Sequence, residues 1–322
     1  MILILSTPND FDTKEVIDWL IHKRAVFFRL NDEDLMNGQV EFYYNPKHID
    51  QSYFKQDQCL IYLKDFNIIW FRKFGFLKNY EEEFGSNSDL VKYMYSEFSI
   101  LRTTILDILN HKKWLCKRTN MPSKLKVLEI AHSCRLKIPD SLVTSSKEKL
   151  NLFFHQNKCS MITKSLGEGK NLVYDNFVFP FFTLKMESIN QIGDKFSPSF
   201  IQKRIEKKYE LRIFYIDGNF YSMVIFSQNN PKTIEDFRNY DLENPNRFEP
   251  YTLPRNIQVK LNKMMNLLGL NTGSIDMIKA TDDNYYFLEI NPSGQFGMTA
   301  APCNYPLYEL VADYLIKNQN GD

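Results

Sequence analysis

The side chains best suited to chemistry lie near the end of the chain, within the stretch from Thr272 to Gly297. They are two carboxylates, Asp276 and Glu289, and one amide, Asn291. Mg²⁺ takes oxygen ligands and is usually held by one or two carboxylates together with substrate phosphates. We therefore predict that these three residues bind a metal. The alternative is a solvated strand face that carries a chance pair of acids.

A β-hairpin would bring the two acids together. Two alternating apolar runs, Ser274 to Ala280 and Tyr285 to Ile290, flank the polar connection Thr281 to Asn284, a pattern typical of a hairpin. Folding it symmetrically about the middle of that connection places Asp276 opposite Glu289. Because side chains alternate along a strand, we expect Phe287, Glu289 and Asn291 to share one side. Acids packed among apolar neighbours need a partner, which favours the metal.

A second stretch indicates phosphate binding. The run Met161 to Lys164 is typical of a strand, and the loop Ser165 to Lys170 that follows contains two glycines. Lys164 could neutralise phosphate oxygens while the glycines let main-chain N–H groups approach, although no Walker A motif is present. The alternative is a surface lysine. Arg212 offers a two-pronged guanidinium to phosphate or acyl phosphate, or alternatively forms a salt bridge with Glu206 or Glu210.

Composition restricts the class of protein. The chain has 322 residues, of which 43% are hydrophobic, enough for a sizeable core in two or three domains. Its net charge of +1 gives no reason to expect nucleic-acid binding. Five scattered cysteines without a C-x-x-C pair indicate reduced thiols. No apolar run of about 18 residues is present and the start lacks a signal peptide, so we expect a cytoplasmic protein without membrane contact.

The beginning of the chain is typical of a parallel α/β sheet. Ile2 to Leu5 and Ala25 to Leu30 are predicted strands on either side of a helix. We expect Asp12 and Thr13 to cap that helix, with Val16, Ile17, Leu20 and Ile21 on its buried stripe. We predict domains at 1–115, 116–190 and 191–322.

Several motifs resemble the ATP-grasp ligases, in the order that this family has them. D…E-x-N-P at Asp276 to Pro292 resembles their metal site, and EINPSGQF is most similar to the maturases of graspetides, the microviridin-type cross-linked peptides. RLNDEDL and WFRKF resemble elements of the N-terminal domain of these maturases. The resemblance implies an α/β (α+β) ATP-grasp fold with an N-terminal parallel-sheet domain. It also implies that Arg72 touches the peptide, whereas the residues alone allow a surface arginine at a strand end.

The resemblance also implies how ATP is bound. Lys124 and Lys164 would contact phosphates, although Ser123 stands where many relatives have Asp. Main-chain groups of Lys203, Arg204 and Ile205 would read adenine, and Glu210 would bind the ribose. The DFR element at Asp236 to Arg238 resembles one that reaches the γ-phosphate, so Arg238 joins Arg212 as a catalytic candidate and Asn239 as a nucleotide contact. Two Mg²⁺ ions would occupy the metal site.

What the resemblance implies for function is macrocyclisation. ATP would activate an Asp or Glu side chain of a ribosomal precursor peptide as an acyl phosphate, and a Thr, Ser or Lys of the same peptide would attack it to form an ester or amide. The partner peptide would carry a leader sequence, the enzyme would be a homodimer, and the subgroup would be the one called grasp-with-spasm. The alternatives are an intermolecular amino-acid ligase similar to glutamate ligases, an ATP-grasp kinase, and a non-catalytic nucleotide-binding scaffold.

Overall fold

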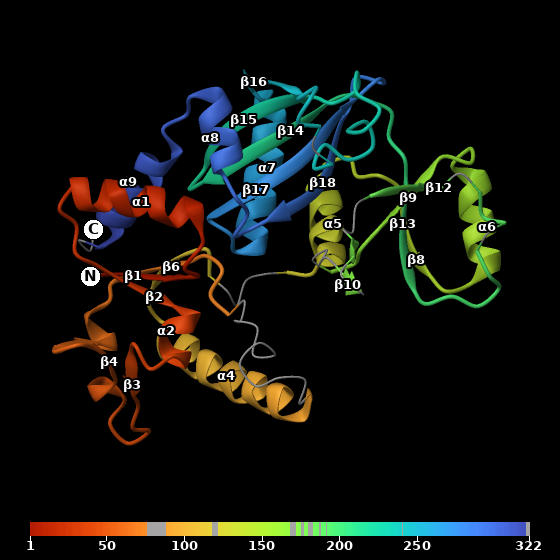
Figure 1. Cartoon of the computed structure of the whole chain (residues 1–322). Helices are drawn as coiled ribbons and strands as arrows, with labels where there is room; N and C mark the ends of the chain where they lie inside the picture. Colours follow the sequence, from red (N-terminus) through yellow and green to blue (C-terminus); the bar gives the residue numbers. More distant parts are fainter. Residues whose placement is uncertain are drawn as a thin grey trace. The chain divides into compact units, whose positions relative to one another are not determined.

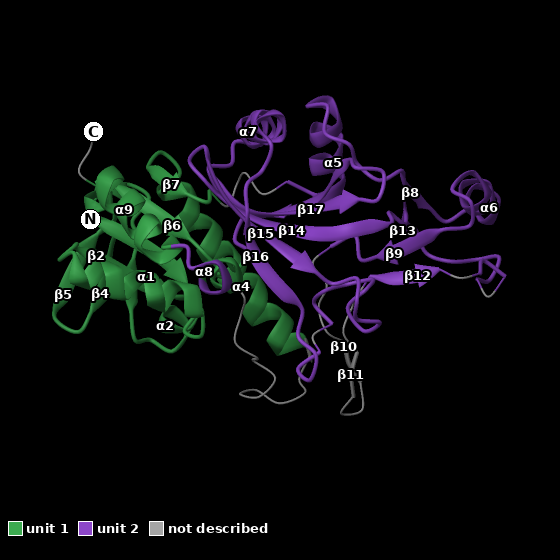
Figure 2. Ribbon diagram, turned by 90° about the horizontal axis from the view of Figure 1, so that it is seen from above, with its two compact units in different colours: residues 1–119, 295–300, 306–322 green, residues 120–294, 301–305 purple. Residues whose placement is uncertain are grey.

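The structure is a computed structural model that describes residues 1–75, 88–117, 122–167, 172–174, 177–179, 183–186, 188–190, 192–239 and 241–319. It divides into two compact units, which are described separately here (Figure 2). The first unit comprises Met1–Thr119, Gln295–Ala300 and Pro306–Asp322, and the second comprises Asn120–Gly294 and Ala301–Tyr305. The chain therefore returns to the first unit after the metal-site motif. The three-domain division stays a prediction.

The first unit is built on a four-stranded parallel sheet in the order β2-β1-β6-β7 (Figure 1). Its central strand β1 is fully buried, as expected for an apolar run inside a parallel sheet. This confirms the predicted parallel sheet. A small antiparallel sheet, β3-β4-β5, belongs to the same unit. The elements of this unit are β1 (Ile2–Ser6), α1 (Phe11–His22), β2 (Phe27–Asn31), α2 (Asp32–Met36), β3 (Glu41–Tyr43), β4 (Tyr53–Gln56), β5 (Cys59–Tyr62), β6 (Ile68–Phe71), α4 (Ser88–Ile108), β7 (Lys113–Leu115) and α9 (Leu307–Gln319), with short 3₁₀ turns at Ile49–Gln51 and Leu63–Asp65.

Helix α1 forms as predicted, but its cap and stripe differ. Val16 and Leu20 are buried, whereas Ile21 is 60% exposed, so its assignment to the buried stripe is wrong. The N-cap is Asp10, not Asp12 or Thr13. Asp12 instead accepts hydrogen bonds from the main-chain N–H groups of Phe296 and Gly297, both at 3.1 Å. A distant segment of the same unit therefore uses the carboxylate that local sequence assigned to a cap.

The RLNDEDL run has a structural explanation. Asn31 and Asp34 form a capping box at the start of α2, in which the Asn31 N–H donates to Asp34 Oδ2 at 2.8 Å. Arg29 Nε donates to Asn31 Oδ1 at 2.9 Å and fixes the amide. The Arg-Leu-Asn-x-x-Asp spacing is thus accounted for by the turn from β2 into α2.

The second unit contains two larger antiparallel sheets, in the orders β12-β9-β13-β8 and β16-β15-β14-β17-β18, and the hairpin β10-β11. Its elements are α5 (Lys124–Ser133), β8 (Ser141–Thr144), α6 (Lys147–Gln156), β9 (Met161–Lys164), β10 (Leu172–Tyr174), β11 (Phe177–Phe179), β12 (Leu184–Met186), β13 (Ser199–Lys203), β14 (Lys207–Ile216), β15 (Asn219–Phe226), β16 (Arg247–Tyr251), α7 (Arg255–Leu268), β17 (Thr272–Ala280), β18 (Tyr285–Asn291) and α8 (Gly297–Cys303), whose residues fall in both units.

Helices α5 and α7 cover one face of the five-stranded sheet, and their apolar side chains pack against it to form the core of the second unit. Strand alternation decides what the other face carries. On β14, Leu211 and Ile213 enter the core, so Arg212 between them points to the opposite face. On β17, Ile275 and Met277 do the same. Arg212 and Asp276 therefore lie on the face opposite to the one that packs against α5 and α7. In the described part of the chain, no helix is long and apolar enough to cross a membrane.

Candidate active site

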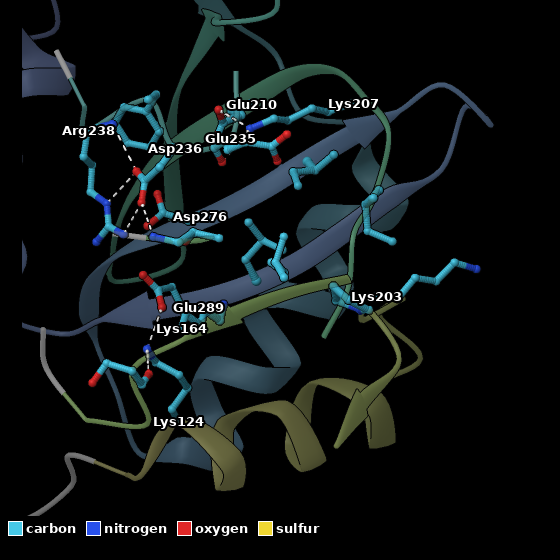
Figure 3. Close-up of a pocket in the computed structure, with 18 of the residues that line it drawn as sticks. Lys124, Lys164, Lys203, Lys207, Glu210, Glu235, Asp236, Arg238, Asp276 and Glu289 are labelled. Carbon is cyan, nitrogen blue, oxygen red and sulfur yellow. Dashed lines mark hydrogen bonds and ion pairs between the residues drawn. The ribbon is translucent and has the colours of Figure 1, made fainter. Parts of the chain in front are cut away.

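A cavity in the second unit gathers most of the predicted site residues (Figure 3). Its walls come from β9, β13, β14, β17 and β18, from the start of α5, and from the loop that follows β15. The predicted residues that line it are Lys124, Lys164, Lys203, Ile205, Glu210, Arg238, Asp276 and Glu289. The glycine loop after β9 is described only to Gly167, so the predicted contribution of its last three residues lies outside the described residues.

The carboxylate pair lies where the hairpin was predicted to place it. Asp276 and Glu289 are directly opposite each other on β17 and β18. The register shifts immediately afterwards, because Met277 faces Phe287 and leaves Leu288 as an extra residue. Phe287 therefore packs in the core while Leu288 and Glu289 both line the cavity. The prediction that Phe287 shares a side with Glu289 is wrong, because a β-bulge interrupts the alternation.

Each acid has its own cationic partner. Arg212 Nη1 lies 2.8 and 2.7 Å from the two carboxylate oxygens of Asp276. Arg212 thus pairs with Asp276, an acid that the sequence did not indicate as its partner. Lys124 Nζ lies 3.3 Å from Glu289 Oε2 and donates to the Ser165 carbonyl at 3.1 Å. Burial raises the pKa of Asp276, partly offset by Arg212. Burial also acts to raise the pKa of Glu289, but Lys164 and Lys124 lower it overall.

Lys164 lines the cavity on the same side as Glu289 and Lys124. Burial lowers the pKa of its ammonium group, and the nearby charge of Glu289 opposes that effect. Its Nζ lies 5.7 Å from the centre of the Phe200 ring. Two lysines and one arginine thus surround two carboxylates. An oxyanion and its divalent cation would complete this arrangement of charges.

Glu210 lies at the other end of the cavity and is 7% exposed. Lys207 Nζ and Ser227 Oγ both donate to its Oε1 at 2.8 Å. No bond to Oε2 is found among the residues described. Burial raises the pKa of Glu210, and Lys207 opposes the rise. One carboxylate oxygen is thus held in place while the other can accept a further donor.

The chain from Lys203 to Ile205 links β13 to β14 along the cavity edge. The Lys203 N–H donates to the Asp140 carbonyl at 2.8 Å, and the Arg204 N–H donates to the Ser160 carbonyl at 3.0 Å. The Arg204 side chain forms a two-pronged ion pair with Glu235, with Nε at 3.0 and 2.9 Å from its oxygens. Within the described residues, the Ile205 N–H makes no main-chain bond, so it is the amide of this stretch best placed to meet a ligand.

Five predicted residues are not among those that line the cavity: Arg204 and Arg212, whose ion pairs are given above, and Asn239, Asn291 and Arg72. Asn239 donates from its side chain to the Lys232 carbonyl at 2.9 Å. Asn291 pairs with Ser274 at the end of β18 and is exposed. Arg72 lies in the first unit and is 3% exposed, so the surface alternative is wrong. It forms ion pairs with Asp10 at 3.0 Å and Asp12 at 3.1 Å.

The donor set fits a hard cation only with help from a ligand. No cluster of three or more His, Cys, Asp or Glu side chains suited to a metal is found among the described residues. At the predicted metal position, Asp276 and Glu289 supply the carboxylate oxygens. Two carboxylates beside lysines and an arginine suit Mg²⁺ that arrives with phosphate oxygens, since this ion is seldom held by protein groups alone.

Comparisons with known proteins bear on the fold. No protein-family model matches the chain, and none of the curated proteins does. Among solved structures, an ATP-grasp ligase associated with RiPP peptides from Chryseobacterium gregarium, in complex with ADP and a leader and core peptide, has a TM-score of 0.84 at 23% identity, over 98% of this chain and 96% of that chain. The macrocyclase MdnC of Microcystis aeruginosa MRC, bound with its precursor peptide MdnA, has a TM-score of 0.82 at 22% identity, over 98% and 100%.

The chain has the ATP-grasp fold. A third ATP-grasp ligase, PsnB, complexed with a minimal precursor, Mg and ADP, has a TM-score of 0.78 at 16% identity, over 99% of this chain and 97% of that chain. A D-alanyl-alanine synthetase A of Vibrio cholerae is more distant, with a TM-score of 0.58 at 11% identity, over 99% and 97%. The fold predicted from sequence is thus confirmed.

Four residues in or next to the cavity hold predicted site residues and were not themselves predicted from sequence. Lys207 and Ser227 hold Glu210, and Glu235 and Asp236 hold Arg204 and Arg238. For Asp236 a signal was present, because it lies in the DFR element from which only the arginine was assigned. Lys207 stands in a run of charged residues and has no distinguishing mark in the sequence.

Proposed function

We propose that the chain is an ATP-dependent peptide maturase that forms macrocyclic ester or amide bonds between side chains of a ribosomal precursor peptide. The observation that carries the proposal is the full-length likeness to ligases solved with precursor peptides, with TM-scores of 0.78 to 0.84, against 0.58 for the D-alanyl-alanine synthetase. The carboxylate and lysine arrangement of the cavity supports an ATP reaction independently.

ATP would lie along the cavity. The Ile205 N–H and the carbonyl groups of the Lys203–Ile205 stretch would contact adenine, and Glu210 Oε2 would accept from a ribose hydroxyl. The phosphates would reach Lys124, Lys164 and Arg238. Asp276 and Glu289, with Asn291 beside them, would hold two Mg²⁺ ions. Bound Mg²⁺ would neutralise charge on the phosphate oxygens.

The reaction would begin with attack of a peptide carboxylate on the γ-phosphorus of ATP, which gives an acyl phosphate and ADP. A hydroxyl or amine of the same peptide would then attack the acyl carbon. Phosphate leaves with the bonding electrons, and the nucleophile loses its proton. Lys124, Lys164 and Arg238 would stabilise the developing charge, and Arg212 would contact the carboxylate or the acyl phosphate. No Ser-His-Asp or Cys-His arrangement is required.

The finer features belong to the same proposal. The partner would be a precursor peptide with a leader, the enzyme a cytoplasmic homodimer, and the bond a carboxylate–alcohol or carboxylate–amine linkage. The test is to incubate the protein with ATP, Mg²⁺ and candidate precursor peptides and to measure peptide mass. Loss of one water per bond supports the proposal. Addition of an amino-acid residue or of phosphate would instead indicate an amino-acid ligase or a kinase.

A further inference from the structure

A buried carboxylate holds the cavity arginine in a two-pronged grip. Asp236 is 7% exposed, whereas the Arg238 side chain is 51% exposed. Arg238 Nε donates to Asp236 Oδ1 at 2.8 Å, and Nη2 donates to Oδ2 at 2.6 Å (Figure 3). These bonds occupy one edge of the guanidinium group. Within the described residues we find no hydrogen bond from Nη1.

Asp236 is itself fixed from two further directions. Its Oδ1 also accepts from the Arg238 main-chain N–H at 3.1 Å, and its Oδ2 accepts from the Thr183 N–H at 3.2 Å. Four donors therefore share the two oxygens, which compensates for burying a charge. Burial acts to raise the pKa of Asp236, but Arg238 lowers it overall, so the carboxylate stays ionised at neutral pH.

Arg238 also interacts electrostatically with the two predicted metal ligands, Asp276 and Glu289. Glu289 and Asp276 both act to raise the pKa of Arg238, after the larger contribution of its hydrogen bonds with Asp236. A long, half-exposed arginine would otherwise lose rotamer entropy on binding a phosphate. A side chain that is already held loses less.

We propose that Asp236 is a positioning residue that presents the free edge of Arg238 to the γ-phosphate of ATP. This rests on the proposed function only in so far as ATP occupies the cavity, and peptide cyclisation is not required for it. The competing explanation is structural. Asp236 also shapes the loop, since the Asn239 N–H donates to its carbonyl at 3.1 Å and the Thr183 bond anchors it.

Nucleotide binding separates the two explanations. ADP lacks the γ-phosphate, so its affinity should not depend on how Arg238 is held. A collapsed loop would weaken ADP binding as well, because Glu235 and Phe237 of the same loop line the cavity. We expect Asp236→Asn to weaken binding of a non-hydrolysable ATP analogue about 10-fold to 100-fold, the range found for residues that orient metal ligands, and to change ADP affinity less than twofold.

Two further variants complete the experiment. Arg238→Met should weaken binding of the ATP analogue but not of ADP. The double variant Asp236→Asn/Arg238→Met should bind the analogue no more weakly than Arg238→Met does, because Asp236 acts through the arginine. Arg238→Lys keeps the charge but cannot make the two-pronged contact with Asp236, so it should also weaken binding of the analogue and not of ADP. This variant tests the proposal even if Asp236→Asn folds poorly. Glu249→Gln is the matched control, since Glu249 pairs with Arg247 at 3.3 Å, also two residues away, outside the cavity lining.

The proposal is overturned by any of four results. These are equal weakening of ADP and analogue in Asp236→Asn, unchanged analogue binding in Asp236→Asn or in Arg238→Met, additive losses in the double variant, or normal analogue binding by Arg238→Lys. Failure of the maturase proposal would show differently, as normal nucleotide binding without any change in peptide mass.

Discussion

Asp276 and Glu289 face each other across β17 and β18, but different cations hold them, Arg212 at 2.7 Å and Lys124 at 3.3 Å.

If both acids hold Mg²⁺, Asp276→Asn and Glu289→Gln should each lower turnover by about 10²–10³-fold, the scale for losing one electrostatic group from an active site. Both variants should fold. The measurement is ADP formation during a magnesium titration. Asp283→Asn, an exposed acid of the same hairpin, is the control. Near-normal turnover in both variants would remove the metal assignment.

Lys164 and Glu210 should act on different parts of ATP. Lys164→Ala should raise the KM for ATP about tenfold or more, because a hydrogen bond to a charged group is worth about 1.5–3 kcal/mol. Glu210→Ala should also weaken ATP binding. The 2′,3′-dideoxy analogue of ATP should then penalise the wild type more than Glu210→Ala. Equal penalties would mean that Glu210 does not bind the ribose, and Lys149→Ala, at an exposed position of α6, should change neither parameter.

Arg72 should matter for stability. Replacing it with Met leaves Asp10 and Asp12 buried without their main cation, and breaking a buried pair typically costs about 3–5 kcal/mol. Urea denaturation measures the loss. Lys92→Met, which breaks an exposed pair with Asp89, should cost about 1 kcal/mol or less. A loss as small for Arg72→Met would show that the buried network does not stabilise the first unit.

Asp32 should make stability depend on pH. It is fully buried, and burial raises its pKa from 3.8 to about 6. Because the folded pKa lies above the unfolded one, this group's contribution is complete below pH 3.8 and is lost as pH rises to about 6. The loss is at most about 3 kcal/mol. Asp32→Asn should therefore gain stability over the wild type between those pH values and keep a constant advantage above them. Parallel stability curves for the two proteins would contradict this.

The fold was predictable where the hydrophobic pattern of a strand is uninterrupted. Ile2 to Leu5 is a continuous apolar run, and it forms the buried central strand of a parallel sheet. The pairing of Asp276 with Glu289 was also correct, but for an incomplete reason. The Ala280 N–H bonds the Asn284 carbonyl, so the loop has three residues, and Leu288 as an extra residue restores the pairing. The spacing of three between Phe287 and Ile290, both of which pack in the core, was the available signal.

Partners were harder to predict than positions. The sequence offered Glu206 and Glu210 to Arg212 because they are near in the chain, whereas the sheet places Asp276 beside it from 64 residues away. Asp12 similarly bonds Gly297, at a separation of 285 residues. Local patterns cannot reveal such pairs, because they depend on which strands become neighbours. The resemblance supplied roles for Lys124 and Glu210 but could not supply Lys207, which contacts the Glu210 carboxylate and the Glu235 carbonyl.

The measurement that tests the central claim most directly is mass spectrometry of a precursor peptide after incubation with the protein, ATP and Mg²⁺, together with the yield of ADP and phosphate. Each bond formed through an acyl phosphate removes one water, provided that the site holds the nucleophile in line and keeps solvent away from the intermediate. We expect the peptide to lose the mass of one water per bond while ADP and phosphate appear in equal number. A gain in peptide mass, or ADP release with unchanged peptide mass, would contradict the maturase account.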